Sequence, residues 1–148
     1  MDLDEAKGEV FLNLVEANSL LLAAIDRQLR ELCQLSHAQF EILVRLAAAP
    51  DGMRMGDLAA ALVFSASGLT YQASQLEKRG LMARSKSADG DERTVVASIT
   101  PEGIEQLERV RPQHLQLVQE ALFDQMSEKE TLLVANVLKR VVAALRRK

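Results

Sequence analysis

The stretch from residue 57 to residue 99, DLAAALVFSASGLTYQASQLEKRGLMARSKSADGDERTVVASI, decides the fold. Its first six residues predict a short helix with its apolar side chains on one side, and the next three are just enough for a turn. Residues 66–79 predict a second helix, ended by Gly80 in the left-handed conformation that favours glycine. Two extended segments, LMAR and TVVASI, flank a polar loop with an Asp-Gly reversal signal. Helix, turn, helix and hairpin in this order predict a winged helix-turn-helix.

Residues 66–79, which we call the reading helix, combine a narrow apolar stripe with a wide polar face. Ser65 is placed to cap this helix, because its hydroxyl can accept a hydrogen bond from a free amide of the first turn. The apolar stripe consists of Leu69, Ala73 and Leu76. The opposite face and its flanks consist of Ser67, Gly68, Thr70, Tyr71, Ser74, Gln75 and Lys78. Such a face can approach base edges in a major groove, with Lys78 reaching a phosphate, and Ser65 at its start is also expected to contact DNA. A merely solvated helix has the same spacing, so this pattern leaves both interpretations open.

Four motifs follow one another from the end of the reading helix. They are Leu76-Glu77-Lys78-Arg79-Gly80-Leu81, Arg84, Asp91-Glu92-Arg93 and Thr100-Pro101-Glu102-Gly103. This set resembles the MarR family (multiple antibiotic resistance regulators) of winged-helix repressors. In that family a helix ends in Leu-Glu-x-x-Gly-Leu, a strand carries an arginine, the wing tip is charged and a strand closes on Thr-x-x-Gly. The flanking helices have the family's number and order, so the resemblance covers nearly the whole chain. In one departure, Tyr71 follows Thr70 where many relatives carry an arginine, and an operator preference is therefore not transferable.

The segments before the reading helix predict two further helices and a short strand. Residues 8–33 carry apolar side chains at a spacing of about 3.5, over a stripe wider than one intramolecular face requires. Ser36 and Gln39 form a capping box for a helix that runs through Ala49. Its expected inward side chains are Phe40, Leu43, Val44 and Ala47. A short third strand is expected at 53–55.

The segments after the hairpin predict two more helices. Thr100 caps a helix that begins with Pro101 and runs toward Asp124, and Pro112 is expected to kink or divide it. A second capping box, at Ser127, opens the last helix. That helix carries two adjacent apolar stripes, more than a chain of 148 residues can cover by itself.

The apolar first and last helices predict a homodimer in which these helices pair across a two-fold axis, which is also how the MarR family dimerises. A monomeric six-helix bundle is the alternative, and it would leave a large apolar area exposed. The expected fold is mainly α with a small antiparallel β wing, a winged helix-turn-helix with N- and C-terminal dimerisation helices. We expect one domain over 1–148, with dimerisation helices at 1–35 and 101–148 and the winged helix-turn-helix at 36–100.

Composition and charge exclude several other classes of protein. The net charge is −3 and aromatic residues make up 3%, which argues against proteins that stack bases on aromatic side chains. Residues 1–53 carry four basic and nine acidic side chains, whereas residues 54–93 carry six basic and five acidic ones. The single cysteine excludes an internal disulfide framework. No apolar run of membrane-spanning length and no leader peptide is expected, so we expect a cytoplasmic protein that does not bind membranes.

The wing supplies the remaining residues expected at a DNA surface. The resemblance implies that Arg93 enters a narrow minor groove and that Asp91 steadies its guanidinium. A water-exposed charge pair in a loop is the alternative. Arg54, Arg84 and Lys86 are the other cations of this region that we expect to contact DNA.

Neither the cysteine nor the histidines predict a catalytic or metal site. Cys33 and His37 are separated by the start of a helix and have no third partner, so a buried, inert thiol is expected. His37 and His114 lack neighbouring ligands at metal-binding spacing, and no cofactor is expected. The resemblance implies that a small aromatic or phenolic acid binds near His37, Phe40 and Val44. A solvated histidine in the first helical turn is the alternative for His37.

These observations together predict a sequence-specific, double-stranded DNA-binding transcriptional regulator and not an enzyme. The resemblance implies a ligand-responsive repressor that binds a near-palindromic operator as a homodimer. A DNA-binding module without a ligand is one alternative. The other is a helical protein–protein adaptor in which the winged-helix scaffold does not bind DNA.

Overall fold

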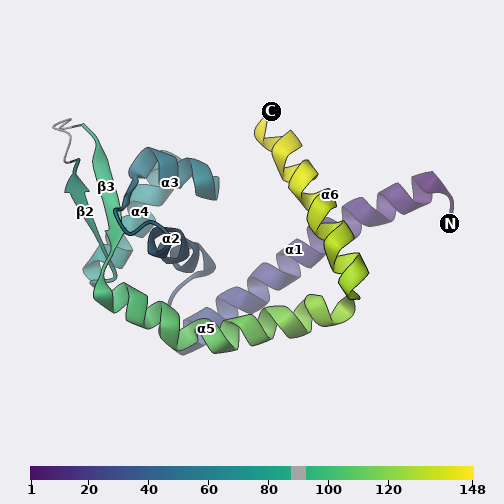
Figure 1. Ribbon diagram of the computed structural model, residues 1–148, viewed down its shortest axis with the longest axis horizontal. Helices are drawn as coiled ribbons and strands as arrows, with labels where there is room; N and C mark the ends of the chain where they lie inside the picture. Colours follow the sequence, from purple (N-terminus) through teal and green to yellow (C-terminus); the bar gives the residue numbers. More distant parts are fainter. Residues whose placement is uncertain (88–92) are drawn as a thin grey trace. The chain divides into compact units, whose positions relative to one another are not determined.

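The computed structural model describes residues 1–87 and 93–148 and has a mainly helical fold with a small antiparallel sheet (Figure 1). Its elements are α1 (Leu3–Cys33), α2 (His37–Ala47), β1 (Met53–Arg54), α3 (Met55–Leu62), α4 (Ala66–Lys78), β2 (Met82–Lys86), β3 (Val95–Ile99), α5 (Pro101–Ala121), the 3-10 helix η1 (Phe123–Gln125) and α6 (Glu128–Arg146). The predicted fold class is confirmed. The chain forms two compact units, Met1–Pro112 and Gln113–Lys148.

The sheet has the strand order β1-β3-β2, with both pairs antiparallel. Met82 pairs with Ile99 at one end of the hairpin and Lys86 with Val95 at the other. The expected third strand is present, although only its first two residues are extended and Met55 already begins α3. Gly103 explains the last motif, because a Cβ at this position would collide with the carbonyl oxygen of Leu81. A glycine therefore lets the start of α5 approach the sheet closely.

The core of the first unit lies between α2, α3, α4 and the sheet. Its fully buried side chains include Leu35, Ile42, Leu43, Leu46, Leu58, Leu69 and Leu76. The inward face predicted for α2 was half right: Phe40 and Leu43 are buried, but Val44 is 44% exposed and Ala47 is also exposed. The reason is that Ile42 and Leu46, one helical turn apart, turn the buried face away from residues 44 and 47.

Several predicted helix boundaries need correction, among them the start of α3, which is Met55 and not residue 57. α1 begins at Leu3 and not at residue 8, because Asp2 accepts a hydrogen bond from the amide of Glu5 and caps the helix there. α2 ends at Ala47, two residues before the predicted end. α5 continues through Pro112 to Ala121 as one helix, so the proline does not divide it, and η1 follows. The caps at Ser36, Thr100 and Ser127 are present as predicted.

α1 is also more apolar than we expected from the sequence. It has 31 residues and an 18-residue window of mean hydropathy 1.4, so its length and composition alone would allow it to cross a membrane. The expectation that no apolar run approaches that length is therefore wrong. One such helix is weak support for a membrane segment, since the core helix of a soluble protein and a signal sequence can have the same length and composition.

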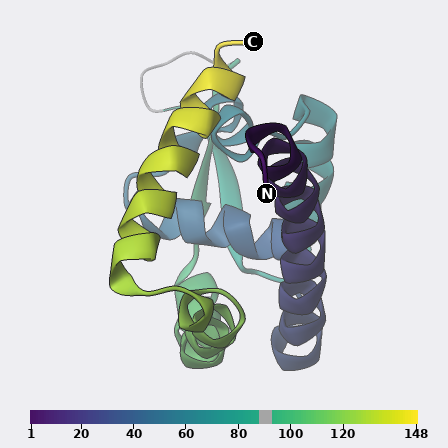
Figure 2. The ribbon, with the colours of Figure 1, turned by 90° about the vertical axis from the view of Figure 1, so that its right-hand side faces the viewer.

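α1 consists of two different halves. Its buried side chains are Ile25, Leu29 and Cys33, all near its C-terminal end. The preceding part extends away from α2, α3, α4 and the sheet as one unbroken helix (Figures 1 and 2). Its exposed apolar side chains are Val10, Phe11, Leu12, Leu14, Val15 and Leu20.

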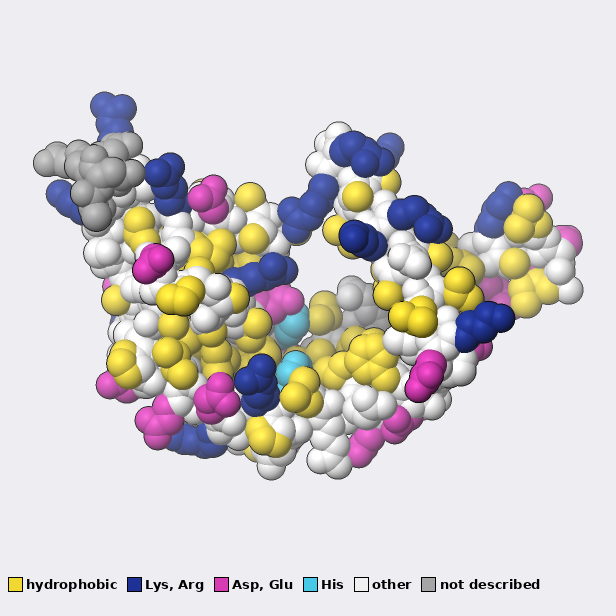
Figure 3. Space-filling model, viewed as in Figure 1, with side chains coloured by type: hydrophobic (Ala, Val, Ile, Leu, Met, Phe, Trp, Pro, Cys, Tyr) yellow, Lys and Arg dark blue, Asp and Glu magenta, His cyan; other side chains and the backbone are white. Residues whose placement is uncertain are grey.

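α6, in the second unit, buries none of its side chains within the chain. Hydrophobic side chains are visible along it in Figure 3, and those most exposed are Leu132, Leu133, Val142 and Leu145. Its start is well defined, because Ser127 and Glu130 hydrogen-bond each other's backbone amides in a capping box. The helix thus has a definite start and an apolar surface that the chain does not cover.

Candidate nucleic-acid interface

The N-terminal turn of α4 presents polar side chains to solvent on a capped helix. The Oγ of Ser65 accepts a hydrogen bond from the amide of Gly68 at 3.1 Å, as the sequence predicted. Ser67 and Thr70 are exposed, and the ring of Tyr71 is 62% exposed. Short side chains at this end leave the helix backbone close to its outer surface.

The inner side of α4 is held by the predicted apolar stripe and one polar contact. Leu69, Ala73 and Leu76 are all buried. The Nε2 of Gln39 on α2 donates to the Oε1 of Gln72 at 3.1 Å. The polar face of α4 is consequently fixed on the outside of the unit, and Lys78 lies exposed at its end.

Arg84 of β2 folds back onto α4 and is not directed freely into solvent. Its Nε donates to Glu77, and its Nη2 donates to the Oγ of Ser74 at 3.1 Å. The Ser74 hydroxyl in turn donates to the carbonyl of Thr70 at 2.9 Å. Ser74 and Arg84, both expected at the DNA surface, therefore take part in a hydrogen-bonded link between the wing and α4. Both side chains are half-buried.

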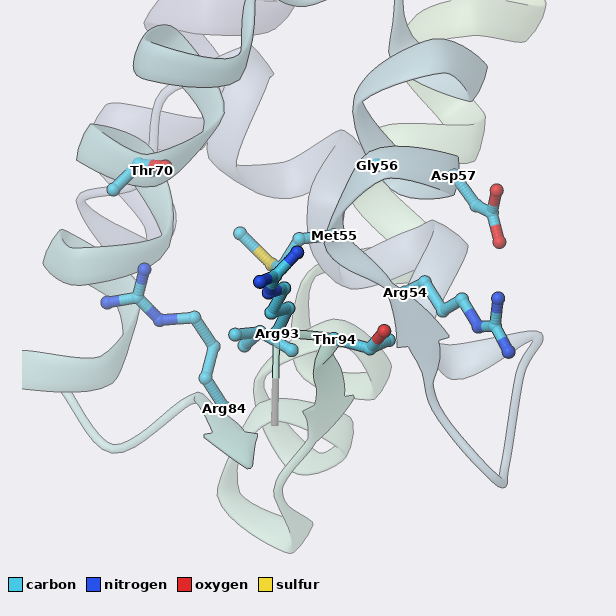
Figure 4. Close-up of a pocket in the computed structure, with 9 residues that line it drawn as sticks. Arg54, Met55, Gly56, Asp57, Thr70, Arg84, Arg93 and Thr94 are labelled. Atoms are coloured by element: carbon cyan, nitrogen blue, oxygen red, sulfur yellow. The ribbon is translucent and has the colours of Figure 1, made fainter. Parts of the chain in front are cut away.

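A pocket of about 550 Å³ beside α4 is lined by Arg54 of β1, by Arg84 of β2 and by Arg93, which precedes β3 (Figure 4). Its lining residues are Arg54, Met55, Gly56, Asp57, Thr70, Arg84, Arg93, Thr94 and Val95. In Figure 4, Arg84 extends from β2 toward the helix that carries Thr70, and Arg93 lies near Met55. Four of the residues expected at the DNA surface thus meet in one place.

The first turn of α3 adds to the positive potential of this pocket. Arg54 occupies the N-cap position of α3, and its side chain makes no capping hydrogen bond there. The amides of a helix N-terminus carry a partial positive charge, which favours an anion. Asp57 lies on the same turn and offsets part of that charge.

The remaining wing residues are exposed or lie outside the described part of the chain. Lys86 and Arg93 are exposed at the end of the hairpin, where Figure 3 shows Lys and Arg side chains gathered. Asp91, expected to steady Arg93, lies outside the described residues. Gln75 is half-buried on α4.

The three residues expected to bind an effector are found in different environments. Phe40 is 7% exposed and belongs to the core, whereas Val44 is 44% exposed. The Nε2 of His37 lies 3.3 Å from the Oε1 of Glu41, and its backbone amide donates to Asp26. None of the three lines the pocket of Figure 4.

One residue that the sequence did not single out makes a long-range contact. The guanidinium of Arg79, the last residue before Gly80, donates to the carbonyl oxygens of Cys33 and Gln34 at the end of α1. Its place in the Leu76–Leu81 motif was visible, but its partners are more than forty residues away in the sequence. Within the described residues, no cluster of three or more His, Cys, Asp or Glu side chains could hold a metal ion.

Comparisons with known proteins agree with the winged helix-turn-helix fold. The family model described as "MarR family" matches residues 35–95. Sco3205, a MarR family transcriptional regulator from Streptomyces coelicolor crystallised with DNA, is 29% identical with a TM-score of 0.91, over 98% of this chain and 91% of that one. AbsC, a MarR family transcriptional regulator from the same organism, is 28% identical with a TM-score of 0.91, over 100% of this chain and 99% of that one. A search of curated proteins gives no match.

A more distant structure shares the fold alone. PcaV from Streptomyces coelicolor, a transcriptional regulator crystallised with its natural ligand, is 21% identical with a TM-score of 0.75, over 98% of this chain and 97% of that one. The family model covers the helix-turn-helix and the wing as far as Val95, the first residue of β3, and the structural matches extend over both terminal helices. Residues 35–95 therefore form a MarR family domain, and the chain as a whole is similar to MarR family transcriptional regulators with a winged helix-turn-helix fold.

Proposed function

We propose that this regulator binds a near-palindromic site on double-stranded DNA as a homodimer, with α4 in the major groove and the wing against the adjacent minor groove. The observation that carries this proposal is the pocket lined by Thr70 of α4 together with Arg54, Arg84 and Arg93. A polar helix face can contact base edges while neighbouring arginines contact phosphates. Sco3205, which was crystallised with DNA, is similar over nearly the whole chain.

Each reading residue has a distinct role in this proposal. Ser67, Gly68, Thr70 and Tyr71 face the bases, because they occupy the exposed N-terminal turns of α4. Lys78, Lys86 and Arg54 contact phosphates, and Arg93 enters the minor groove. Arg84 acts mainly by holding the wing on α4 through Glu77 and Ser74.

Dimerisation is supported by apolar surface that the chain does not cover. The first half of α1 and the whole of α6 expose leucine and valine side chains along their lengths. Apolar area of this extent favours burial against a second copy of the chain. A dimer that binds two half-sites one helical turn apart also gains affinity, because its two DNA contacts are linked. This gain compensates for the repulsion between DNA and a chain of net charge −3.

We further propose that the protein is a cytoplasmic, ligand-responsive repressor. The effector in this proposal is a small aromatic or phenolic acid that binds near His37, Phe40 and Val44. It would release DNA only if it binds more tightly to a state in which the distance between the two reading helices does not match the two half-sites. Family membership supports this role. Titration of phenolic acids into a preformed DNA complex tests it, and a DNA affinity that no such acid changes would contradict it.

The DNA-binding proposal is tested on duplexes selected from a random library. We expect Arg93→Ala to weaken binding at least tenfold, about 1.4 kcal/mol, and to lower the slope of log K against log salt by about one. Lys7→Ala, which removes another exposed cation, at the start of α1, is the control and should stay within twofold of wild type. An Arg93→Ala affinity within twofold contradicts the wing contact. Failure of the wild type to bind any duplex at low salt contradicts the whole proposal and favours an adaptor.

A further inference from the structure

The contact between Arg79 and the end of α1 joins the two parts of the molecule that a DNA-binding dimer must hold in fixed relation. Arg79 is the C-cap residue of α4. Its Nη2 donates to the carbonyl of Cys33 at 2.8 Å, and its Nη1 donates to the carbonyl of Gln34 at 2.9 Å. Cys33 is the last residue of α1, and Gln34 is its left-handed C-cap with φ 58°.

The chemistry of this contact suits an arginine and no other side chain. The last carbonyl groups of a helix have no partner within the helix and carry a partial negative charge. A guanidinium presents several N–H donors in a rigid fork, so it can serve two neighbouring carbonyls at once. A lysine has a single ammonium on a flexible stem and cannot reproduce that geometry.

Few other contacts fix the angle between α1 and the winged helix-turn-helix. Among the described residues, the fully buried side chains of α1 begin at Ile25, and Leu21, Leu22 and Ala24 before it are half-buried, so the helix is attached through its C-terminal part. Apolar packing at Leu29 and Leu35 is not directional and allows rotation more readily than a hydrogen bond does. Asp26 adds a second polar link, because its carboxylate accepts from the backbone amide of His37 at the start of α2.

A small rotation at this contact would have a large effect at the DNA surface. The 13 residues of α4 span about 20 Å at 1.5 Å per residue. A rotation of about ten degrees about its C-terminal end therefore moves its N-terminal turn by about 3.4 Å, the length of one base-pair step. The Arg79 contact lies at that C-terminal end, and the reading residues lie at the other.

We propose that Arg79 is a positioning residue that sets the half-site spacing accepted by the dimer. This inference rests on the proposed function, since it needs a dimer that reads two half-sites through α4. Arg79 itself does not contact DNA in this scheme. Because its side chain is exposed and water competes for its hydrogen bonds, it contributes more to specificity than to stability.

The test compares wild type with Arg79→Gln on duplexes in which two selected half-sites are at the preferred spacing or one base pair closer or farther apart. We define the spacing ratio as the affinity for the duplex with the preferred spacing divided by the affinity for a duplex that is one base pair shorter or longer. We expect this ratio to be at least fivefold lower in Arg79→Gln than in wild type. Binding to a single half-site should stay within twofold. Arg79→Lys, which keeps the charge without the fork, should give an intermediate ratio.

The controls separate positioning from loss of charge and from loss of fold. Lys78→Gln removes the neighbouring exposed cation and should lower affinity for every spacing by a common factor, leaving the ratio within twofold. Partial unfolding likewise reduces binding to all duplexes equally and cannot change the ratio. If Arg79→Gln does not fold, Arg79→Lys decides the question.

Two results would overturn the inference, and they are distinguishable. A spacing ratio that remains within twofold of wild type in both Arg79 variants overturns the role of Arg79 and leaves the proposed function intact. A wild type that binds duplexes without any preference between spacings overturns the two-half-site function and, with it, this inference.

Discussion

The two ends of α1 have similar apolar content and very different surroundings. From Ile25 onward, Ile25, Leu29 and Cys33 are buried within the chain, and this end of the helix is hydrogen-bonded to the start of α2 and to the C-cap of α4. Before Ile25, valine, leucine and phenylalanine side chains are exposed to solvent. The comparison shows that hydrophobic periodicity indicates a face to be buried but does not say what buries it. In this protein the C-terminal end packs within the chain, and we propose that the N-terminal half packs against a second copy.

The largest expected effect is at the buried end. Leu29 is 0% exposed, so Leu29→Ala removes packed methyl groups and leaves a cavity. We expect the free energy of unfolding to fall by about 2–5 kcal/mol in urea denaturation, with the same loss at every protein concentration.

Leu14→Ala, in the exposed half of the same helix, is the matched control for Leu29→Ala. Its side chain is 45% exposed, and its loss should matter only through the dimer. Its effect should therefore be smaller and should vary with protein concentration. Equal, concentration-independent losses for both variants would remove the distinction between the two ends of α1.

A charge at the exposed half should act on association. We expect Leu14→Glu to raise the Kd of the dimer at least tenfold, about 1.4 kcal/mol, because a carboxylate would be buried in the apolar interface. Sedimentation equilibrium measures this Kd directly. Asn13→Glu places the same charge on the neighbouring polar stripe with Glu9 and Glu16 and should leave the Kd within twofold. A monomeric wild type at micromolar concentration would contradict the proposed dimer.

The smallest effect concerns the polar contacts of the buried end and depends on pH. Hydrogen bonds from Arg30 and from the backbone amide of His37 lower the pKa of Asp26 below its ordinary value of 3.8. A carboxyl whose pKa is lowered in the folded state stabilises the fold above its unfolded pKa, and that stabilisation is lost as the pH falls through the folded pKa. Because Asp26 is about a third exposed, we expect a contribution of less than about 1 kcal/mol.

The measurement is the difference in unfolding free energy between wild type and Asp26→Asn. Wild type should be slightly more stable at neutral pH, and the difference should disappear as the pH falls below about 4. Asp4→Asn, at the other end of α1, removes a carboxylate that is 91% exposed and should change stability by no more than about 0.5 kcal/mol. If the difference in unfolding free energy between wild type and Asp26→Asn grows on acidification, the ionised Asp26 carboxylate does not stabilise the fold, and this prediction is wrong.

Local features of the fold could be predicted because their causes lie within a few residues of one another. The caps at Ser36, Ser65, Thr100 and Ser127 and the paired wing strands are of this kind. The error at the start of α1 had a local signal too, since Asp2 and Glu5 form the cap. The exposed position of Val44 had no such signal, because the buried face of α2 depends on which elements pack against it.

The candidate site divides in the same way. The polar face of α4 followed from helical spacing, and Ser67, Thr70 and Tyr71 are exposed as expected. The hydrogen bonds of Arg84 with Glu77 and Ser74 could not be predicted from helical spacing, because the partners of a long side chain depend on which groups the fold brings within its reach.

The sequence by itself determined the winged helix-turn-helix, the helix caps and the family, since each depends on short-range spacing and turn chemistry. Only the tertiary structure decided that Arg54, Arg84 and Arg93 line one pocket with Thr70, and that the guanidinium of Arg79 donates to the carbonyls at the end of α1. The physical reason is distance along the chain. A contact between residues far apart in sequence exists only after the core has folded and has brought both helix ends to within a hydrogen bond of each other.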